Sequence, residues 1–137
     1  MKATKLNSSA RSRGFLLIAA VLISGCLAAV PIVINITIDV APNVLNLQNK
    51  GTVVTVHTDV AYSLVAATSV YLNGVLIQSW KADDRGNFVA KFNMEAIKDL
   101  PLVINGYNTL TLTGYLTTGE QITGSQQIKV VNNLPKK

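Results

Sequence analysis

Hydrophobic and polar residues alternate with a period of two along most of the chain after residue 32, which is typical of half-buried strands. In residues 33–40, isoleucine or valine occupies every even position, while Asn35, Thr37 and Asp39 lie between them. The pattern predicts strands at residues 33–40, 52–58, 69–72, 75–80, 88–92, 109–117 and 121–131, and a short extended piece at 44–47. Residues 59–68 are apolar but irregular, and we predict a loop or crossover there.

Glycine and asparagine mark the turns between these strands. Asn73-Gly74 lies between two apolar runs and predicts a hairpin with a type I′ turn, because that turn needs positive φ at both central residues. Further turns are predicted at residues 48–51, 82–87, 105–106 and 118–119. One helix is predicted, at residues 94–100, with Asn93 as its N-cap and Pro101 beyond its end.

About seven short strands separated by turns predict an all-β fold, an immunoglobulin-like (Ig-like) antiparallel β-sandwich at residues 32–132. Tyr107 lies just before the strand 109–117, where such folds place a tyrosine corner, but the chain lacks the Cys–Trp–Cys spacing of antibody domains. The layout also resembles a broad group of prokaryotic Ig-like surface modules, through residues 41–47, 70–74, 86–92 and 110–114. The resemblance covers residues 38–131 and implies the fold, but these modules have no settled activity.

The first 25 residues have a different pattern. Four basic residues and no acidic residue precede the nine-residue apolar run 15–23, and Ser24 and Gly25 are small. This order predicts a secretory signal at residues 1–25. The stretch Ile23-Ser24-Gly25-Cys26 resembles the lipobox of bacterial lipoproteins, which implies diacylglyceryl transfer to the Cys26 thiol, cleavage between Gly25 and Cys26, and N-acylation of the new terminus. Several acyl chains, at about 0.8 kcal/mol per buried methylene, would hold the protein firmly at a membrane.

Two alternatives fit the same stretch. The apolar sequence continues for eight residues beyond Cys26 and is about long enough to cross a bilayer without cleavage, although Pro31 weakens such a helix. An ordinary signal peptidase would instead cut after Ala28 or Ala29. A twin-arginine signal is not indicated, because only Arg13 stands where that signal has two arginines.

Charge and cysteine content limit the partners, the cross-links and the location that are expected for the protein. Most of the net charge of +5 belongs to the signal, and residues 26–137 carry a net charge of +1, so nucleic acid is not favoured as a partner. Cys26 is the only cysteine, so a lipidated chain can form no disulfide. The residue after Cys26 is Leu27 and not aspartate. By resemblance to sorted lipoproteins, this residue implies the outer membrane if the cell has one. Residues 26–31 would be the lipidated terminus and a short link, and residues 133–137 a frayed tail.

The sequence carries no pattern typical of catalysis or of a metal site. His57 is the only histidine and has no histidine or cysteine nearby in the sequence, so a surface position on its strand is expected. The stretch Asp83-Asp84-Arg85-Gly86-Asn87 faintly resembles a calcium loop, but its spacing is wrong and a hairpin turn is expected. No serine lies in a Gly-x-Ser-x-Gly elbow. We expect a protein that is not an enzyme and has no cofactor beyond the lipid on Cys26.

Besides membrane lipid, two classes of partner fit the domain. A surface protein would bind at an edge strand or a loop, and the domain would then be a binding or assembly module. A glycan would stack on aromatic side chains, with Tyr115 and Trp80 as the candidate contacts. Tyr115 is expected to be exposed because its strand neighbours Thr113 and Thr117 are polar, whereas a single tryptophan in a sandwich is more often packed in the core. Aromatic side chains gathered on one exposed face would favour the glycan, and an open, flat edge strand would favour the protein.

Overall fold

The computed structural model describes residues 31–134, which hold ten strands, a short 3-10 helix and one α-helix. The predicted signal, its cleavage site between Gly25 and Cys26, the lipidation site Cys26 and residues 135–137 of the tail lie outside the described residues. Neither helix within residues 31–134 is long and apolar enough to cross a membrane. Strands dominate the described chain, so the prediction of an all-β fold is confirmed.

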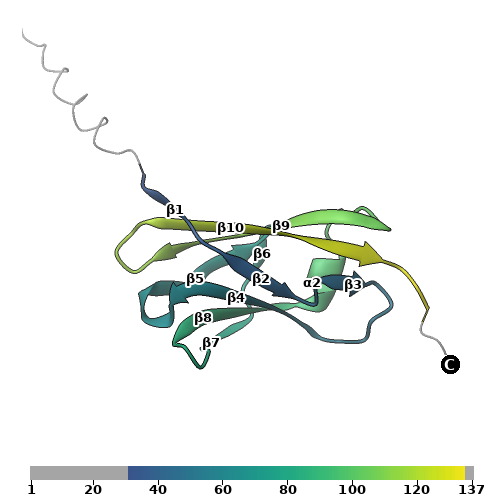
Figure 1. Cartoon of the computed structure of the whole chain (residues 1–137), viewed down its shortest axis with the longest axis horizontal. Helices are drawn as coiled ribbons and strands as arrows, with labels where there is room; N and C mark the ends of the chain where they lie inside the picture. The colour runs from purple at the N-terminus through teal and green to yellow at the C-terminus, as the bar shows by residue number, and fades with distance from the viewer. Residues whose placement is uncertain (1–30, 135–137) are drawn as a thin grey trace, which may run out of the picture. The chain divides into compact units, whose positions relative to one another are not determined.

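The strands form two sheets (Figure 1). Sheet A has the order β1 (Val33–Asn35), β10 (Gln121–Val131), β9 (Gly106–Leu116), β5 (Val65–Leu72) and β6 (Val75–Leu76), and β3 (Val44–Asn46) pairs with the last part of β10. Sheet B has the order β2 (Ile38–Ala41), β4 (Val53–Ala61), β8 (Asn87–Asn93) and β7 (Ser79–Ala82). All neighbouring strands are antiparallel except β1 and β3, which run parallel to β10.

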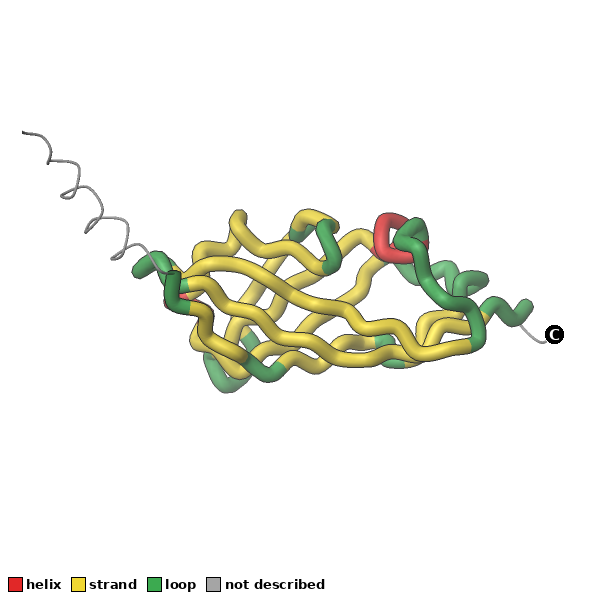
Figure 2. The backbone as a smooth tube through the Cα atoms, turned by 90° about the horizontal axis from the view of Figure 1, so that it is seen from above, coloured by secondary structure: helices red, strands yellow, loops and turns green. Residues whose placement is uncertain are grey.

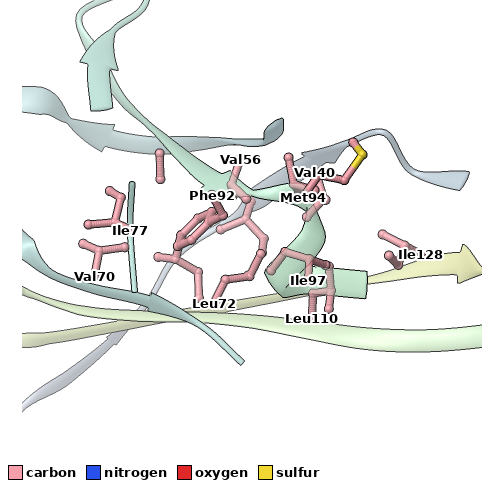
Figure 3. Close-up of a cluster of buried hydrophobic side chains, with 14 of the residues drawn as sticks. Val40, Val56, Val70, Leu72, Ile77, Phe92, Met94, Ile97, Leu110 and Ile128 are labelled. Carbon is pink, nitrogen blue, oxygen red and sulfur yellow. The ribbon is translucent and has the colours of Figure 1, made fainter. Parts of the chain in front are cut away.

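The two sheets enclose one hydrophobic core, as in a β-sandwich. Phe88, Ala90 and Phe92 of β8 point inward as predicted, and Leu110 and Leu112 of β9 meet them from the other sheet. Figure 3 shows part of this cluster, with Val56 and Phe92 from sheet B and Leu72 and Leu110 from sheet A. Burying one such side chain contributes about 1.5–3 kcal/mol relative to leaving it in water. The buried members are Ile38, Val40, Leu45, Val54, Val56, Val65, Val70, Leu72, Ile77, Phe88, Ala90, Phe92, Met94, Ile97, Leu110, Leu112, Ile122, Ile128 and Val130.

The single strand predicted at residues 33–40 is wrong, because the chain crosses from one sheet to the other in the middle of it. β1 pairs with β10 in sheet A and β2 pairs with β4 in sheet B. The crossing lies directly against Gly124 of β10, where an added Cβ atom would be 2.8 Å from the Ile36 carbonyl oxygen and 2.8 Å from Ile38 Cγ2. Only glycine leaves room for the backbone here. Alternation along the sequence does not reveal such a crossing, because both halves keep a period of two.

Residues 59–68, predicted as a loop or crossover, are a crossover, because they lead from β4 in sheet B to β5 in sheet A. The loop alternative is wrong, because most of the stretch belongs to these two strands. β4 runs to Ala61, a 3-10 helix η2 (Tyr62–Leu64) turns the chain, and β5 begins at Val65. The pairing register shifts between His57 and Ala61 in one strand and between Ala66 and Tyr71 in the other. These bulges add residues that break the alternation, which is why the sequence looks irregular although the backbone is extended.

The run predicted as one strand at residues 75–80 is divided between the sheets as well. β6 completes a hairpin in sheet A, Ile77 inserts into the core, and β7 joins the edge of sheet B. The hairpin turn itself is confirmed, since φ is +47° at Asn73 and +85° at Gly74. The Asn73 side chain accepts a hydrogen bond from Thr111 N (2.7 Å), which ties the turn to β9.

The predicted helix is confirmed and is shorter than expected. α2 (Met94–Lys98) begins where the Asn93 side chain accepts a hydrogen bond from Ala96 N (3.1 Å), as an N-cap does. Figure 2 shows α2 near the end of the domain at which the described C-terminus lies. Close to that terminus, the side chain of Asn46 makes two hydrogen bonds to the backbone of Asn133. Asn46 Nδ2 donates to the Asn133 carbonyl oxygen, and Asn133 N donates to Asn46 Oδ1.

Candidate functional site

The outer face of sheet A carries exposed tyrosines among uncharged polar side chains, and we call it the tyrosine face. The antiparallel register places outward residues of β9 directly opposite outward residues of β10. These pairs are Tyr115 with Gln121, Thr113 with Thr123, Thr111 with Ser125, Thr109 with Gln127, and Tyr107 with Lys129. Lys129 is the only charged residue among these ten, so this part of the surface is almost neutral.

Two of the tyrosines are close neighbours on this face. Tyr71 of β5 is paired with Thr113, which lies two residues before Tyr115 on β9. Outward residues in such diagonal positions are about 7–8 Å apart between Cα atoms. Tyr71 is 41% exposed and Tyr115 is 49% exposed, so both rings are accessible. Leu76 lies opposite Tyr71 on β6 and extends the apolar part of the patch.

The backbone under Tyr115 is fixed by a side chain from the β5 bulge. Ser69 Oγ accepts a hydrogen bond from Tyr115 N (2.9 Å) and donates one to the Ala66 carbonyl oxygen (2.6 Å). Two rows further along the face, the hydroxyl groups of Thr111 and Ser125 are 2.8 Å apart and hydrogen-bonded across the strands. The tyrosines therefore project from a sheet whose register is held by hydrogen bonds on both sides.

The side chains of this patch combine aromatic rings with hydrogen-bonding groups. Aromatic rings offer flat apolar surfaces, and each tyrosine adds a hydroxyl group that can donate or accept a hydrogen bond. The side chains of Gln121, Thr113 and Thr123 beside them add amide and hydroxyl groups. This combination fits a neutral ligand with alternating apolar and hydroxyl-bearing surfaces.

The other predicted aromatic contact lies elsewhere. Trp80 is on β7, the edge strand of sheet B, and its strand partner is Ala90, which belongs to the core. Trp80 is therefore directed to the inner side of sheet B at its edge, and the structure does not bring it together with Tyr115 on sheet A. Tyr62 lies in η2 with its ring centroid 6.3 Å from that of Phe88.

The expected tyrosine corner is not formed by Tyr107. This residue is 67% exposed and lies within β9 on the tyrosine face, opposite Lys129. A corner tyrosine would instead be packed against the turn, with its hydroxyl group bonded to the backbone. Sequence reasoning predicted exposure for Tyr115 and did not predict that Tyr71 would be its neighbour, because the bulge in β5 hides the register between the two strands.

A hollow lies on the outer side of sheet B at His57, which is exposed on its strand as expected. The acidic side chains around it were not predicted from the sequence. Asp39 is directly opposite His57 in the strand pairing, and Asp59 and Asp83 line the same hollow of about 370 Å³, together with Arg85. The sequence separates these acids by up to 44 residues, so only the fold gathers them.

The carboxylates in this hollow are already engaged by the chain. Asp59 Oδ1 accepts a hydrogen bond from Thr37 N (3.1 Å) at the crossing between β1 and β2. Asp83 Oδ1 accepts from Asn87 N (2.9 Å) and from Arg85 N (2.8 Å), which closes the turn between β7 and β8. These bonds lower the pKa of the Asp83 carboxyl group, the bond from Asn87 most, and the nearby charges of Arg85 and His57 act in the same direction.

The turn at residues 83–87 is thus a hairpin turn held by an aspartate side chain. Within residues 31–134, no group of three or more histidine, cysteine, aspartate or glutamate residues is arranged so that it could hold a metal ion. One carboxylate oxygen of Asp83, Oδ1, accepts the two backbone hydrogen bonds that close this turn.

The described chain is a two-sheet β domain with an exposed, almost neutral aromatic face. Comparison of the chain with known proteins finds no matching family model, no matching curated protein and no matching solved structure. Its function is therefore inferred from its own residues and their geometry.

Proposed function

We propose that this protein is an exported lipoprotein, anchored through lipid on Cys26, whose Ig-like domain is a non-catalytic surface module for binding or assembly. The support for the anchor is the lipobox-like stretch ending at Cys26, placed directly after an apolar run with a basic N-terminal flank. In a cell with two membranes, Leu27 after the cysteine favours the outer membrane.

The strand order supports the Ig-like part of the proposal. Immunoglobulin sandwiches place strands A, B, E and D in one sheet and strands G, F and C in the other, with C′ added in some. If β2 and β4 are A and B, then β5 to β10 follow as C, C′, D, E, F and G. Sheet B then has the order A, B, E, D, and sheet A has the order G, F, C, C′.

The tyrosine face carries the binding part of the proposal. A broad exposed surface with three tyrosines and one lysine on its strands is suited to recognition, because aromatic side chains contribute large contact area with few rotamers. The edges of the sheets are less suitable. β6 and β7 have two and four residues, and the backbone N–H of Val40 on β2 is already bonded to Gln126 Oε1 (2.6 Å). Addition of a partner strand therefore has little to pair with on these strands.

A carbohydrate is the second candidate ligand, and the neighbouring rings of Tyr71 and Tyr115 favour it. Sugar rings stack on aromatic faces, and their hydroxyl groups bond to amide and hydroxyl side chains such as those of Gln121 and Thr123. Because this part of the face is uncharged, the sugar would be neutral. A protein partner would use the same face through its aromatic contacts.

The anchor is tested by metabolic labelling. Full-length protein expressed in a bacterium should incorporate labelled palmitate, and Cys26→Ser should abolish the incorporation. Equal labelling of the variant, or a mature protein whose mass begins at Met1, would contradict the lipoprotein proposal.

The binding face is tested with matched tyrosine variants. Saturable binding of the domain to one class of neutral glycan on an array, lost in Tyr115→Ala and in Tyr71→Ala, would support the carbohydrate candidate. Tyr107→Ala is the control, because it removes an exposed tyrosine of the same face about 27 Å along the same strand. If no glycan binds, a protein crosslinked on intact cells through the wild-type domain and absent with Tyr115→Ala supports the assembly role. Unchanged binding in Tyr115→Ala and in Tyr71→Ala would remove the tyrosine face from the proposal.

A further inference from the structure

One end of the domain, the end at which β1 begins, exposes aliphatic side chains. Ile32 is 64% exposed, Leu64 of η2 is 46% exposed, and Ile34 of β1 is exposed as well. The segments that bear Ile32 and Leu64 are both bonded to the hairpin formed by β9 and β10. Gln121 N donates to the Ile32 carbonyl oxygen (3.0 Å), and Thr117 N donates to the Leu64 carbonyl oxygen (2.8 Å). We call this surface the apolar end.

The apolar end surrounds a groove of about 350 Å³. Ile34 and Leu64 line it from β1 and η2, and Leu116 of β9 and Ile122 of β10 line it from sheet A. Ile34 is paired directly with Ile122 across the two strands. The groove thus continues the hydrophobic core to the surface, where nothing in residues 31–134 covers its rim.

Acidic side chains surround this surface. Asp59 lines the groove, and Glu120 lies in the turn between β9 and β10. The turn between β7 and β8, with Asp83 and Asp84, is at the same end, because Tyr62 N donates a hydrogen bond to the Gly86 carbonyl oxygen (2.8 Å). Arg85 is the one basic residue in that turn. An apolar centre with an acidic rim suits a partner that is apolar inside and carries cationic groups around it.

The chain before the apolar end limits what can lie against it. Only six residue steps separate Cys26 from Ile32, which span at most about 20–22 Å when fully extended. An acyl chain on Cys26 would therefore keep the apolar end within that distance of the bilayer interface. We infer that the apolar end rests on the membrane surface, with Ile32 and Leu64 among the acyl chains just below the headgroups and the acidic rim among the cationic groups of zwitterionic lipids. This inference rests on the proposed lipid anchor.

The test uses the lipidated full-length chain with one added cysteine. Because Cys26 is the only natural cysteine and its thiol carries the lipid, Leu64→Cys introduces the only free thiol for an environment-sensitive fluorophore. Val103→Cys is the matched control, since Val103 is a 62% exposed aliphatic residue near the other end of β10, where Asn105 N donates a hydrogen bond to the Val130 carbonyl oxygen. The labelled proteins are placed in phosphatidylcholine vesicles whose acyl chains carry bromine as a quencher.

We expect a blue shift and loss of most of the fluorescence at position 64, and neither change at position 103. Replacing part of the phosphatidylcholine with anionic phosphatidylglycerol should reduce the quenching, because the rim is acidic. If Leu64→Cys misfolds, Ile34→Cys provides a second position on the same rim, to which the same expectations apply.

Other occupants of the apolar end give different results. If the loss of fluorescence disappears when each vesicle holds a single protein, it comes from self-quenching between neighbouring copies and not from the brominated lipid. This result would mean contact between copies and would overturn the inference. A blue shift without quenching, kept in detergent, would mean that residues 27–31 fill the groove and would also overturn it. Equal fluorescence at positions 64 and 103 in a protein that incorporates palmitate would refute membrane contact and leave the anchor intact. Absence of palmitate incorporation would instead refute the anchor itself.

Discussion

Gly124 is the position at which a single added methyl group should cost most for its size. The crossing from β1 to β2 lies against it, and an alanine Cβ atom would be 2.8 Å from the Ile36 carbonyl oxygen and from Ile38 Cγ2. The backbone there cannot easily move away, because Ile36 N donates a hydrogen bond to the Thr123 carbonyl oxygen (2.8 Å). Gly124→Ala must therefore strain the packing or break this bond.

The competing effects can be estimated. Replacing glycine by alanine reduces the entropy of the unfolded chain, which stabilises the fold by about 0.4–1 kcal/mol where the backbone permits it. Overpacking a tight site costs about 1–3 kcal/mol, and a lost hydrogen bond adds about 0.5–1.5 kcal/mol. The net effect should be destabilisation by about 1–3 kcal/mol, which corresponds to a fall in Tm of roughly 5–20 °C for a domain of about 100 residues.

The assay is thermal and urea unfolding of the domain expressed from Val30, followed by circular dichroism. Gln127→Ala is the control, because Gln127 lies three residues further along β10 on the exposed face and should change stability by less than about 0.5 kcal/mol. A Tm for Gly124→Ala equal to or above that of the wild type would show that the crossing does not depend on this close contact.

Three further predictions follow from the same domain. Leu112→Asp should unfold it, because an unpaired carboxylate replaces a fully buried side chain, while Thr113→Asp on the outer face should be tolerated; similar Tm values would mean that the faces of β9 are misassigned. Gly74→Val should cost about 1–3 kcal/mol through backbone strain alone, since φ is +85° and no atom lies within 4 Å of the added Cβ, and unchanged urea unfolding would contradict this. Because the pKa of Asp83 is lowered in the folded protein, its carboxylate stabilises the fold fully at pH values above the ordinary pKa of 3.8, and this contribution is lost as the pH falls through the lowered pKa. Asp83→Asn should therefore weaken the dependence of Tm on acid pH. An identical dependence would exclude the role of the hydrogen bonds that Asp83 accepts from Arg85 and Asn87.

The features that could be predicted from the sequence are local ones. The Asn73-Gly74 turn and the N-cap at Asn93 depend on a few neighbouring residues whose conformational preferences are strong. The faces of β9 could be assigned because its eleven residues have no bulge. In such segments, the period of two gives the inner and outer side chains directly.

The features that could not be predicted depend on contacts between distant segments. The run 33–40 crosses between sheets because Gly124, more than 80 residues later, leaves space for it. Tyr71 becomes the neighbour of Tyr115 because β5 advances five residues between two pairs that are only two residues apart on β9. No local pattern encodes such a register, since the extra residues of the bulge look irregular in sequence.

The tyrosine face and the apolar end together limit the kind of ligand that can bind. Tyr115 is in the same row as Gln121 and Val33, and Val33 is next to Ile32 at the apolar end. If that end rests on the bilayer, the Tyr71 and Tyr115 pair lies close to the membrane surface, whereas Tyr107, eight residues along β9, is about 27 Å away along the strand. A ligand for the tyrosine pair must then reach the membrane surface, as a membrane-linked glycan or a neighbouring membrane protein does. Because both partners would be confined to one surface, weak contacts could suffice, since confinement raises their effective concentration.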